Sequence, residues 1–271
     1  AALHDRLGRG IAAAQAYGIA LAQAPPDSEL DAPTRQAVER ARAVHQKHVA
    51  DLGRFIRERA ADARDLCTPV ERRRIESFID TTLRTRKRYQ QEPMEYCYPG
   101  LPSIEFYERG EFPWLTEFES ATDAVRRELG RILVEDEKEF APYIHYDDHL
   151  PLDQWRELNK SPRWSAFHFY DQGREIAERC ARAPDTMRAI RLLPQPDVAL
   201  RSPTAMFSVL QPKTRIPPHT GVANFRLVFH RPLIVPGNCR FRVGSETREW
   251  RVGETWVFDG TIEHEARNDS D

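Results

Sequence analysis

The sequence predicts an α+β protein, in which an α-helical region is followed by an antiparallel β-domain. Apolar residues recur at helical spacing through residues 1–92, and the hydrophobic period changes to two from residue 204 onward. Between these stretches, residues 92–102 contain three prolines and a glycine, a composition typical of a linker. We therefore expect a helical region at 1–95 and a β-domain at 96–271.

The helical region is expected to contain three long helices. Pro25-Pro26 separates the first two, whose apolar residues lie three or four positions apart. The third begins where Thr68-Pro69-Val70-Glu71 has the spacing of a capping box, with proline at the first helical position. These features predict an array of helical hairpins, although the stretch lacks a clear self-similarity at the period of about 34 residues found in some helical repeats.

The β-domain is expected to begin with a helix and irregular structure. Thr116-x-x-Glu119 has the spacing of a second capping box and predicts a helix to about residue 140. Residues 141–200 are rich in proline and aromatic residues, so we expect loops there, with a short helix near 172–190. Alternating apolar and polar residues then predict strands at 204–211, 224–235, 239–243, 246–252, 255–259 and 262–267.

The strand expected at 224–230 indicates what the sheet surrounds. Its aromatic and leucine side chains would point to one face, while the opposite face would carry Asn224, Arg226, Val228 and His230. One face would therefore combine a cation with an imidazole. We expect an antiparallel sandwich or barrel with a polar interior, which is a usual location for a small-molecule site.

Composition narrows the class of partner. The net charge is only −2 with 30% charged residues, which argues against a nucleic-acid-binding protein. The sequence contains no apolar run near the ~18 residues that span a bilayer, so we expect no membrane contact from this segment. The four cysteines are scattered and form no C-x-x-C, which favours a reducing, cytoplasmic location. Ala1 and Asp271 suggest a chain cut at both ends, and an upstream targeting or membrane segment stays open.

Two histidines near the C-terminus are the candidate metal ligands. His219 and His264 lie 45 residues apart and flank the alternating run, so they could meet across the mouth of a barrel. Each alone fits an ordinary loop or strand-end residue, but a pair of neutral imidazoles suits Fe(II). Gly221 stands where many non-haem iron oxygenases have a carboxylate, so water or an anion would fill that coordination position. Asp259 and Glu263 are alternative ligands at less suitable distances along the strand.

Three further residues could hold an anionic cosubstrate. Arg226 and His230 on one face could bind a dicarboxylate, although a salt bridge or an interior polar network is an equally simple explanation. Ser208 falls on one face of its expected strand with Met206 and Leu210. A buried hydroxyl there needs a hydrogen-bond partner, and a cosubstrate carboxylate is one candidate.

The chain resembles the aspartyl/asparaginyl β-hydroxylase family, whose members are Fe(II)- and 2-oxoglutarate-dependent dioxygenases. The resemblance covers residues 100–271 and is strong from residue 203 onward. It rests on the order and spacing of Ser208-Val-Leu-Gln-Pro, Pro218-His219-Thr-Gly221, Asn224-x-Arg226-Leu-x-x-His230, Glu246-Thr-Arg-x-Trp250 and Phe258-Asp259-x-x-x-Glu263-His264-Glu265.

That resemblance implies a fold and a set of roles. The β-domain would be a double-stranded β-helix, which is a cupin-like jelly roll, and the helical region would be similar to the repeats that precede it in animal members. His219 and His264 would bind the iron, with Gly221 matching the family's own missing carboxylate. Ser208 and His230 would hold 2-oxoglutarate, and Arg226 would line the cosubstrate or substrate pocket.

Several positions depart from the animal members of that family. Val228 stands in place of a second arginine, Gly260 in place of an aspartate and Ala166 in place of a glutamine. Because these positions surround the substrate in those members, the resemblance carries over the iron chemistry better than the substrate. The family also has an arginine about ten residues after the second histidine, which pairs with the distal carboxylate of 2-oxoglutarate. We expect that residue near position 274, beyond Asp271.

The sequence therefore predicts a dioxygenase that uses Fe(II), 2-oxoglutarate and O2 to hydroxylate an amino-acid side chain. The β-carbon of Asp or Asn in a peptide or protein is the first candidate, and a free amino acid or a lipid acyl chain is the alternative. A halogenase is a further enzyme class, because chloride could take the coordination position beside Gly221. From a different class, the chain could be a peptide-binding helical protein, or a cupin-like sensor that binds metal and 2-oxoglutarate without turnover.

Overall fold

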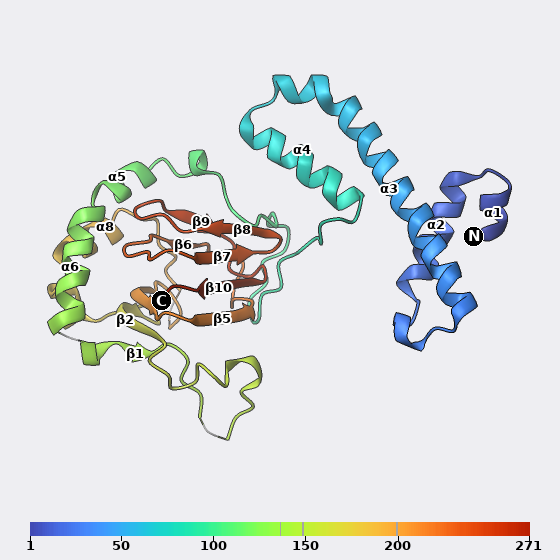
Figure 1. Ribbon diagram of the computed structural model, residues 1–271. Coiled ribbons are helices and arrows are strands. Elements are labelled where there is room, and N and C mark those ends of the chain that lie inside the picture. The colour runs from blue at the N-terminus through green and yellow to red at the C-terminus, as the bar shows by residue number, and fades with distance from the viewer. Residues whose placement is uncertain (136, 148, 199) are drawn as a thin grey trace. The chain divides into compact units, whose positions relative to one another are not determined.

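The computed structural model describes residues 1–271 with the exception of residues 136, 148 and 199. The backbone is mixed α and β with antiparallel sheets, as the sequence predicts (Figure 1). It divides into two compact units, Ala1–Lys87 and Arg88–Asp271. The sequence placed the boundary between 95 and 96. None of the described helices has both the length and the apolar character needed to cross a membrane.

The first unit is built from helices. Its core is small and lies where α2 packs on α3, around Ala13, Tyr17 and Ala41. The capping box at Thr68 is confirmed, since its hydroxyl accepts from the backbone N–H of Glu71 while the Glu71 carboxylate accepts in return. The helices are α1 (Ala2–Arg6), α2 (Gly10–Ala22), α3 (Ala32–Leu66) and α4 (Pro69–Thr82), with a 3₁₀ turn at Asp27–Glu29.

The helices of the second unit differ from the prediction at one capping box. Thr116 lies inside a helix that begins at Leu115, so it cannot cap it. Glu119 instead accepts hydrogen bonds from the Arg109 guanidinium and from the backbone N–H of Thr255, both at 2.8 Å. A guanidinium binds a carboxylate more strongly than a neutral backbone N–H does. The capping-box spacing therefore gave a wrong prediction for Glu119. The helices are α5 (Leu115–Ser120), α6 (Thr122–Glu135), α7 (Ala177–Ala181) and α8 (Pro184–Ile190).

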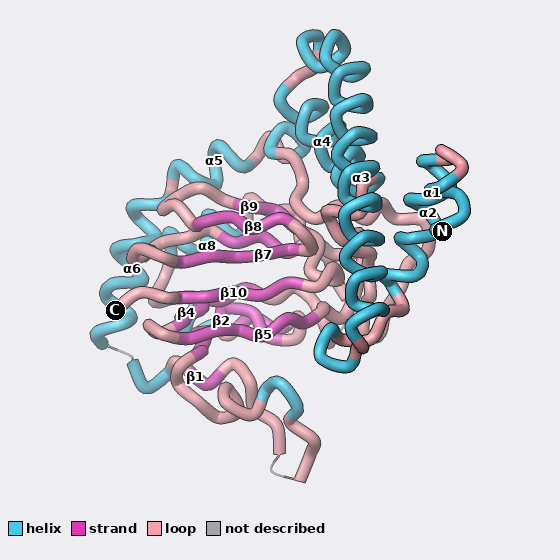
Figure 2. The backbone as a smooth tube through the Cα atoms, turned by 45° about the vertical axis from the view of Figure 1, so that its right-hand side comes forward, coloured by secondary structure: helices cyan, strands magenta, loops and turns pink. Residues whose placement is uncertain are grey.

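The strands of the second unit form three antiparallel groups. Figure 2 shows them gathered side by side, with α6 and α8 along one side. The first group contains β1 (Ala141–Pro142), β2 (Trp164–Asp171), β3 (Arg174–Glu175) and β4 (Ala205–Leu210). The second runs in the order β5 (Thr214–His219), β10 (His264–Asn268), β7 (Cys239–Val243) and β8 (Glu246–Glu249). The third pairs β6 (Val228–His230) with β9 (Trp256–Phe258).

Several predicted strand positions were wrong. Strand β2 falls in the stretch expected to be loops, because its first four residues are all buried and give no alternation. Strand β5 was missed because it contains Pro217 and Pro218. Proline is tolerated there since β5 is the edge strand of its sheet. The strand expected at 224–235 shrinks to 228–230, and the residues before it form a turn.

Two hydrophobic cores hold the second unit together. One packs the outer face of β2 and β4, with Phe167, Phe169 and Phe207, against the helices. The other lies between β2/β4 and the sheet that contains β5, β7 and β10, and includes Trp164, Phe241 and Phe258. Two polar residues, His219 and His264, lie at the end of that sheet where β5 stops and β10 starts.

Candidate active site

His219 and His264 are direct neighbours. His219 is the last residue of β5 and His264 the first of β10, and the antiparallel register pairs them with each other. Their ring centroids are 4.1 Å apart. The sequence led us to expect that they would meet across the mouth of a barrel, whereas they lie on adjacent hydrogen-bonded strands. A β-bulge between His264 and Ala266 interrupts the register just after the pair.

The backbone fixes which nitrogen of each ring carries the proton. Nδ1 of His219 lies 2.8 Å from the carbonyl oxygen of Pro217, and Nδ1 of His264 lies 2.9 Å from that of Ile262. A carbonyl oxygen can only accept, so each Nδ1 must be the donor. In the neutral ring Nε2 then has the lone pair, and a metal-binding histidine is oriented by this kind of contact.

Both imidazoles are held in the neutral form. Burial lowers the pKa of His219 below its ordinary value. Burial, together with repulsion from the His219 ring, lowers the pKa of His264 to about 3. Two half-buried rings this close could not both be protonated without strong repulsion. The arrangement therefore suits a shared cation, which neutral imidazole nitrogens can coordinate.

The two acids considered as ligands are engaged elsewhere. Asp259 is fully buried and accepts hydrogen bonds from Gln91 and Thr261. Glu263 forms an ion pair with Arg242 at 2.8 Å. Within the described residues, no set of three or more His, Cys, Asp or Glu side chains could hold a metal ion together. The two imidazoles remain the candidate metal ligands.

Gly221 is fixed by close backbone packing. Its N–H donates to the carbonyl of Gly260 at 2.7 Å, and a Cβ added at this position would lie 2.9 Å from the same oxygen. Real Cβ atoms essentially never come so close, so the Gly260 turn would have to move before any side chain could fit. A carboxylate two residues after His219 is thus excluded by sterics in this backbone.

Aromatic rings form one wall beside the histidines. The Trp155 ring meets His219 edge-on at 5.1 Å, and stacks on Trp164 at 6.2 Å. Tyr143 also stacks on Trp164, at 4.0 Å. Sequence reasoning missed Trp155 and Tyr143, because both fall in the stretch read as loops. Its density of aromatic residues was the available signal.

Ser208 has a partner within the protein. Its hydroxyl accepts a hydrogen bond from the indole Nε1–H of Trp164 at 3.1 Å, across the β2–β4 pair. The expectation that this serine is buried was wrong, since Ser208 is exposed. Because its oxygen already accepts from the indole, its own O–H stays able to donate to a ligand.

His230 lies in an aromatic cage. Its ring centroid is 5.0 Å from that of Phe241 and 4.9 Å from that of Phe258. The same two rings contact His264, at 5.9 and 5.7 Å. Burial lowers the pKa of His230 to about 4, so the ring is neutral near pH 7. His230 therefore shares two walls with the histidine pair and can offer a neutral N–H.

Arg226 lies in the turn before β6. Its guanidinium donates to the hydroxyl of Ser202 at 3.0 Å and to the carbonyl of Arg201 at 3.4 Å. The single strand face expected to carry Arg226 and His230 is therefore not formed. Arg226 lines a pocket of about 510 Å³ whose walls include Tyr96, Val222 and Phe225.

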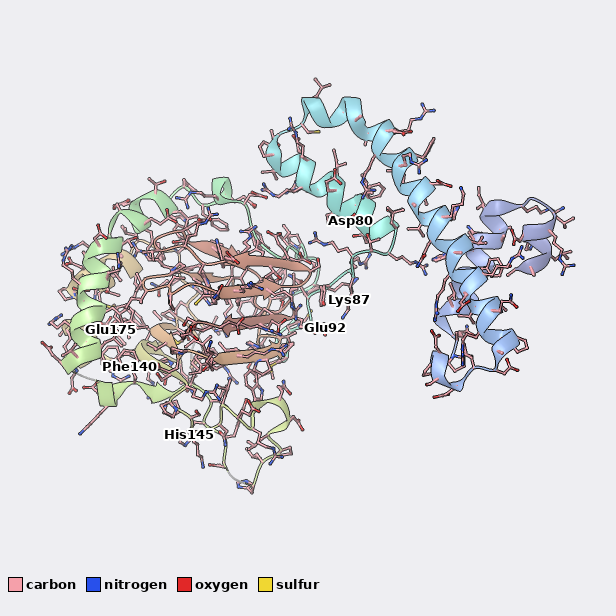
Figure 3. All side chains as sticks on the ribbon, viewed as in Figure 1. Asp80, Lys87, Glu92, Phe140, His145 and Glu175 are labelled. Carbon is pink, nitrogen blue, oxygen red and sulfur yellow. The ribbon has the colours of Figure 1, made fainter. Side chains whose placement is uncertain are left out.

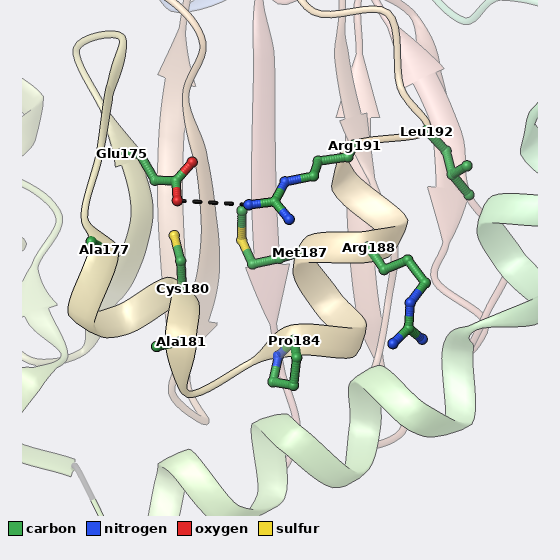
Figure 4. A pocket seen from close by; sticks show the side chains of 9 residues that line it. All are labelled: Glu175, Ala177, Cys180, Ala181, Pro184, Met187, Arg188, Arg191 and Leu192. Atoms are coloured by element: carbon green, nitrogen blue, oxygen red, sulfur yellow. Dashed lines mark ion pairs between the residues drawn. The ribbon is translucent and has the colours of Figure 1, made fainter.

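A larger concavity lies away from these residues. It has a volume of about 660 Å³ and is bordered by β3, α7 and α8 (Figure 4). Its two arginines are paired, Arg191 with Glu175 at 3.7 Å and Arg188 with Asp185 at 2.6 Å. It contains none of the candidate site residues, so the histidine pair is the better candidate for chemistry.

Comparison with known proteins gives an independent view of the chain. The sequence model of the aspartyl/asparaginyl beta-hydroxylase family matches residues 119–271. Human aspartyl/asparaginyl beta-hydroxylase is 34% identical over 122 residues, which are 45% of this chain and 16% of the human protein. The span matched by the family model, residues 119–271, includes both histidines.

Two other relatives are similar over a longer stretch. The ornithine lipid ester-linked acyl 2-hydroxylase of Rhizobium tropici is 28% identical over 181 residues, 66% of this chain and 59% of that protein. Aspartate beta-hydroxylase domain-containing protein 2 of Xenopus tropicalis is 28% identical over 178 residues, 65% of this chain and 45% of that protein. The chain thus spans less than two thirds of the length of each of these relatives.

Proposed function

This chain belongs to the aspartyl/asparaginyl β-hydroxylase family, and we propose on that basis that it is a dioxygenase that uses Fe(II), 2-oxoglutarate and O2 to hydroxylate an amino-acid side chain. The β-carbon of Asp or Asn in a peptide or protein is the first candidate. The proposal includes a double-stranded β-helix fold for the second unit. The observation that supports it best is the pair of neutral imidazoles whose Nδ1 atoms are held by backbone carbonyls.

His219 and His264 would hold the iron through Nε2. When bound, the iron would allow O2 to oxidise both 2-oxoglutarate and the substrate: one oxygen atom would convert a substrate C–H to C–OH, and the other would enter succinate as CO2 is released. The Pro217 and Ile262 carbonyls keep both rings in the tautomer that offers Nε2. Because Gly221 has no side chain, water or an anion would take the coordination position that a carboxylate fills in other iron sites.

Three residues would hold 2-oxoglutarate. The Ser208 hydroxyl can donate to a carboxylate while it accepts from Trp164. The neutral His230 ring can donate one N–H inside its aromatic cage. Arg226 supplies a cation to the pocket that it lines with Val222 and Phe225, in the loop that follows His219. The Phe241 and Phe258 rings shield His230 from water, which strengthens its polar contact.

A second candidate substrate is a lipid acyl chain. One relative is described as an acyl 2-hydroxylase. In this structure, the methyl group of Val228 lies 3.0 Å from where a Cβ of Gly260 would be, and that point is 4.0 Å from Cε1 of His264. An apolar side chain therefore borders the histidine pair, and an apolar substrate would fit beside it.

The proposal is tested by metal binding and by turnover. We expect the purified chain to bind Fe(II), or Co(II) as a spectroscopic substitute, and to form succinate from 2-oxoglutarate when substrate is present. His219→Ala and His264→Ala should abolish both, whereas His145→Ala, at an exposed histidine (Figure 3), should leave both intact. Full succinate formation in either of the first two variants would exclude them as ligands.

A substrate screen by mass spectrometry separates the candidates. A mass increase of one oxygen on an Asp- or Asn-containing peptide supports the first, and the same increase on an acyl chain supports the second. Incorporation of chlorine instead would show a halogenase. Binding of 2-oxoglutarate without consumption in every mixture would indicate a sensor.

A further inference from the structure

An extended segment at the start of the second unit, residues 91–98, runs along the loop that follows His219 and the loop that leads to His264. We call it the strap. The backbone N–H of Glu92 donates to the carbonyl of Thr261 at 2.8 Å, and that of Met94 donates to the carbonyl of Gly221 at 2.9 Å. Thr261 precedes His264 by three residues, and Gly221 follows His219 by two. Two alternate N–H groups of one strap therefore bind one loop each, and Glu92 lies at that end of the sheet (Figure 3).

The strap continues along the loop that follows His219. The backbone N–H groups of Glu95 and Tyr96 both donate to the carbonyl of Val222, at 3.1 and 3.0 Å. The N–H of Asn224 donates back to the carbonyl of Tyr96 at 3.3 Å. These bonds form a short parallel bridge between Tyr96 and Ala223. The strap is thus paired with this loop in the manner of an added strand.

A buried polar network joins the strap to the other loop through side chains. Asp259 is fully buried, and its Oδ1 accepts from the N–H and the hydroxyl of Thr261 at 2.9 and 2.6 Å. Its Oδ2 accepts from the amide Nε2 of Gln91 at 2.5 Å. Buried polar oxygens are costly unless they find donors, and Gln91 supplies the donor for Oδ2 of Asp259.

The same glutamine reaches the first loop. Its Oε1 accepts from Nδ2 of Asn224 at 3.1 Å, and Asn224 is itself buried and bonded to the backbone of Tyr98 on both sides of its amide. One amide group of Gln91 therefore donates to the loop that leads to His264 and accepts from the loop that follows His219. The two loops are also linked directly, because the backbone N–H of Gly221 donates to the carbonyl of Gly260.

We propose that Gln91, with its partners Asn224 and Asp259, is a positioning residue that sets the spacing of the two imidazoles. It does not touch the ion or the substrate. It acts by holding the two loops at a fixed separation, so that the two Nε2 atoms converge on one ion. The proposal rests on the metal-binding role given to the histidines under the proposed function. Changes in groups that orient metal ligands typically weaken metal binding by about 10- to 100-fold.

Reciprocal substitutions test this bridge. Gln91→Glu sets two carboxylates against each other, and Asp259→Asn sets two amide groups against each other. The double variant restores a donor on residue 259 and an acceptor on residue 91, and it still accepts from Asn224. It loses the bond from Gln91 to the carbonyl of Pro102, so recovery should be incomplete. Gln46→Glu on α3 and Glu117→Gln on α5 are matched exchanges at exposed positions.

Co(II) binding to the full chain is the measurement, by titration calorimetry and by the visible absorption bands that report ligand geometry. We expect each single variant to bind Co(II) about tenfold more weakly with altered bands. The double variant should recover most of the affinity and the wild-type bands, and the two controls should match wild type. A thermal melt confirms that each variant is folded. If a single variant unfolds, Gln91→Ala replaces it, since Gln91 is half-buried and water can enter.

The possible failures are distinct. Absence of Co(II) binding in the wild-type chain would refute the proposed function, and the positioning role with it. Normal Co(II) binding in both single variants, or in Gln91→Ala where it replaces one, would refute the positioning role alone. A double variant that binds as weakly as the singles would also overturn it, because the defect would then not come from the broken pair.

Discussion

The indole N–H of Trp164 donates to the hydroxyl oxygen of Ser208 at 3.1 Å, which joins the aromatic wall to the candidate cosubstrate site. Ser208→Ala removes the O–H that would donate to a carboxylate. We expect the apparent KM for 2-oxoglutarate to rise by about 10- to 100-fold with a smaller change in kcat, since a lost hydrogen bond to a charged group costs about 1.5–3 kcal/mol. Steady-state succinate formation measures both. An unchanged KM would remove Ser208 from the cosubstrate site.

Gly221 is expected to resist substitution for steric reasons. Gly221→Ala forces a Cβ against the Gly260 carbonyl, which should destabilise the fold by about 1–3 kcal/mol. Gly237→Ala is the matched control, because nothing lies within 4 Å of its added Cβ. Denaturant unfolding measures the difference. Gly221→Asp should weaken Co(II) binding rather than complete the ligand set, and a tighter complex would contradict the steric account.

The Arg109–Glu119 pair should contribute stability that depends on pH. Burial opposes ionisation of Glu119, but hydrogen bonds from Arg109 and Thr255 outweigh it and hold the pKa of Glu119 below its ordinary value. A carboxyl whose folded pKa is depressed stabilises the protein above its unfolded pKa, and this contribution is lost as the pH falls through the folded pKa.

Glu119→Gln should therefore cost about 1 kcal/mol near pH 7, a modest value because half of the Arg109 side chain is exposed. The difference from wild type should shrink as the pH is lowered from about 5 towards 3. Thermal melts across this range measure it. A difference that is constant with pH would show that the ionised carboxylate is not what stabilises this contact.

Val228 should distinguish the two substrate classes. Val228→Asn places a polar amide beside Gly260 and the histidine pair without much change in volume. If the substrate is an acyl chain, its apparent KM should rise about tenfold, because an unpaired polar group facing an apolar partner costs about 1–3 kcal/mol. Turnover of an Asp-containing peptide should not fall. Val252→Asn, at an exposed position, is the control. An equal effect on both substrates would remove Val228 from specificity.

The sequence located the candidate site better than it located the strands that build it. His219 and His264 were chosen as a candidate pair because they flank the alternating run and match the motifs of the family resemblance, and the structure brings the two rings together. Their placement on adjacent strands could not be predicted from the sequence, because β5 contains two prolines. Proline is tolerated in β5 since it is the edge strand of its sheet.

Other errors have the same origin in tertiary structure. The Thr116 capping box failed because Arg109, seven residues upstream, takes the Glu119 carboxylate. The strand expected through 224–230 forms only at Val228, Phe229 and His230, because a turn precedes them. Nothing in the sequence marked Gln91, because its role depends on partners 133 and 168 residues away along the chain.

The span matched by the family begins at residue 119, whereas the segment braced against both histidine loops ends at 98. A protein trimmed to the recognisable domain would keep both imidazoles and every strand, yet it would lack the scaffold that fixes their spacing. The smallest fragment that binds iron tightly should therefore contain Gln91 and begin upstream of it. Domain limits drawn from sequence similarity alone would miss it.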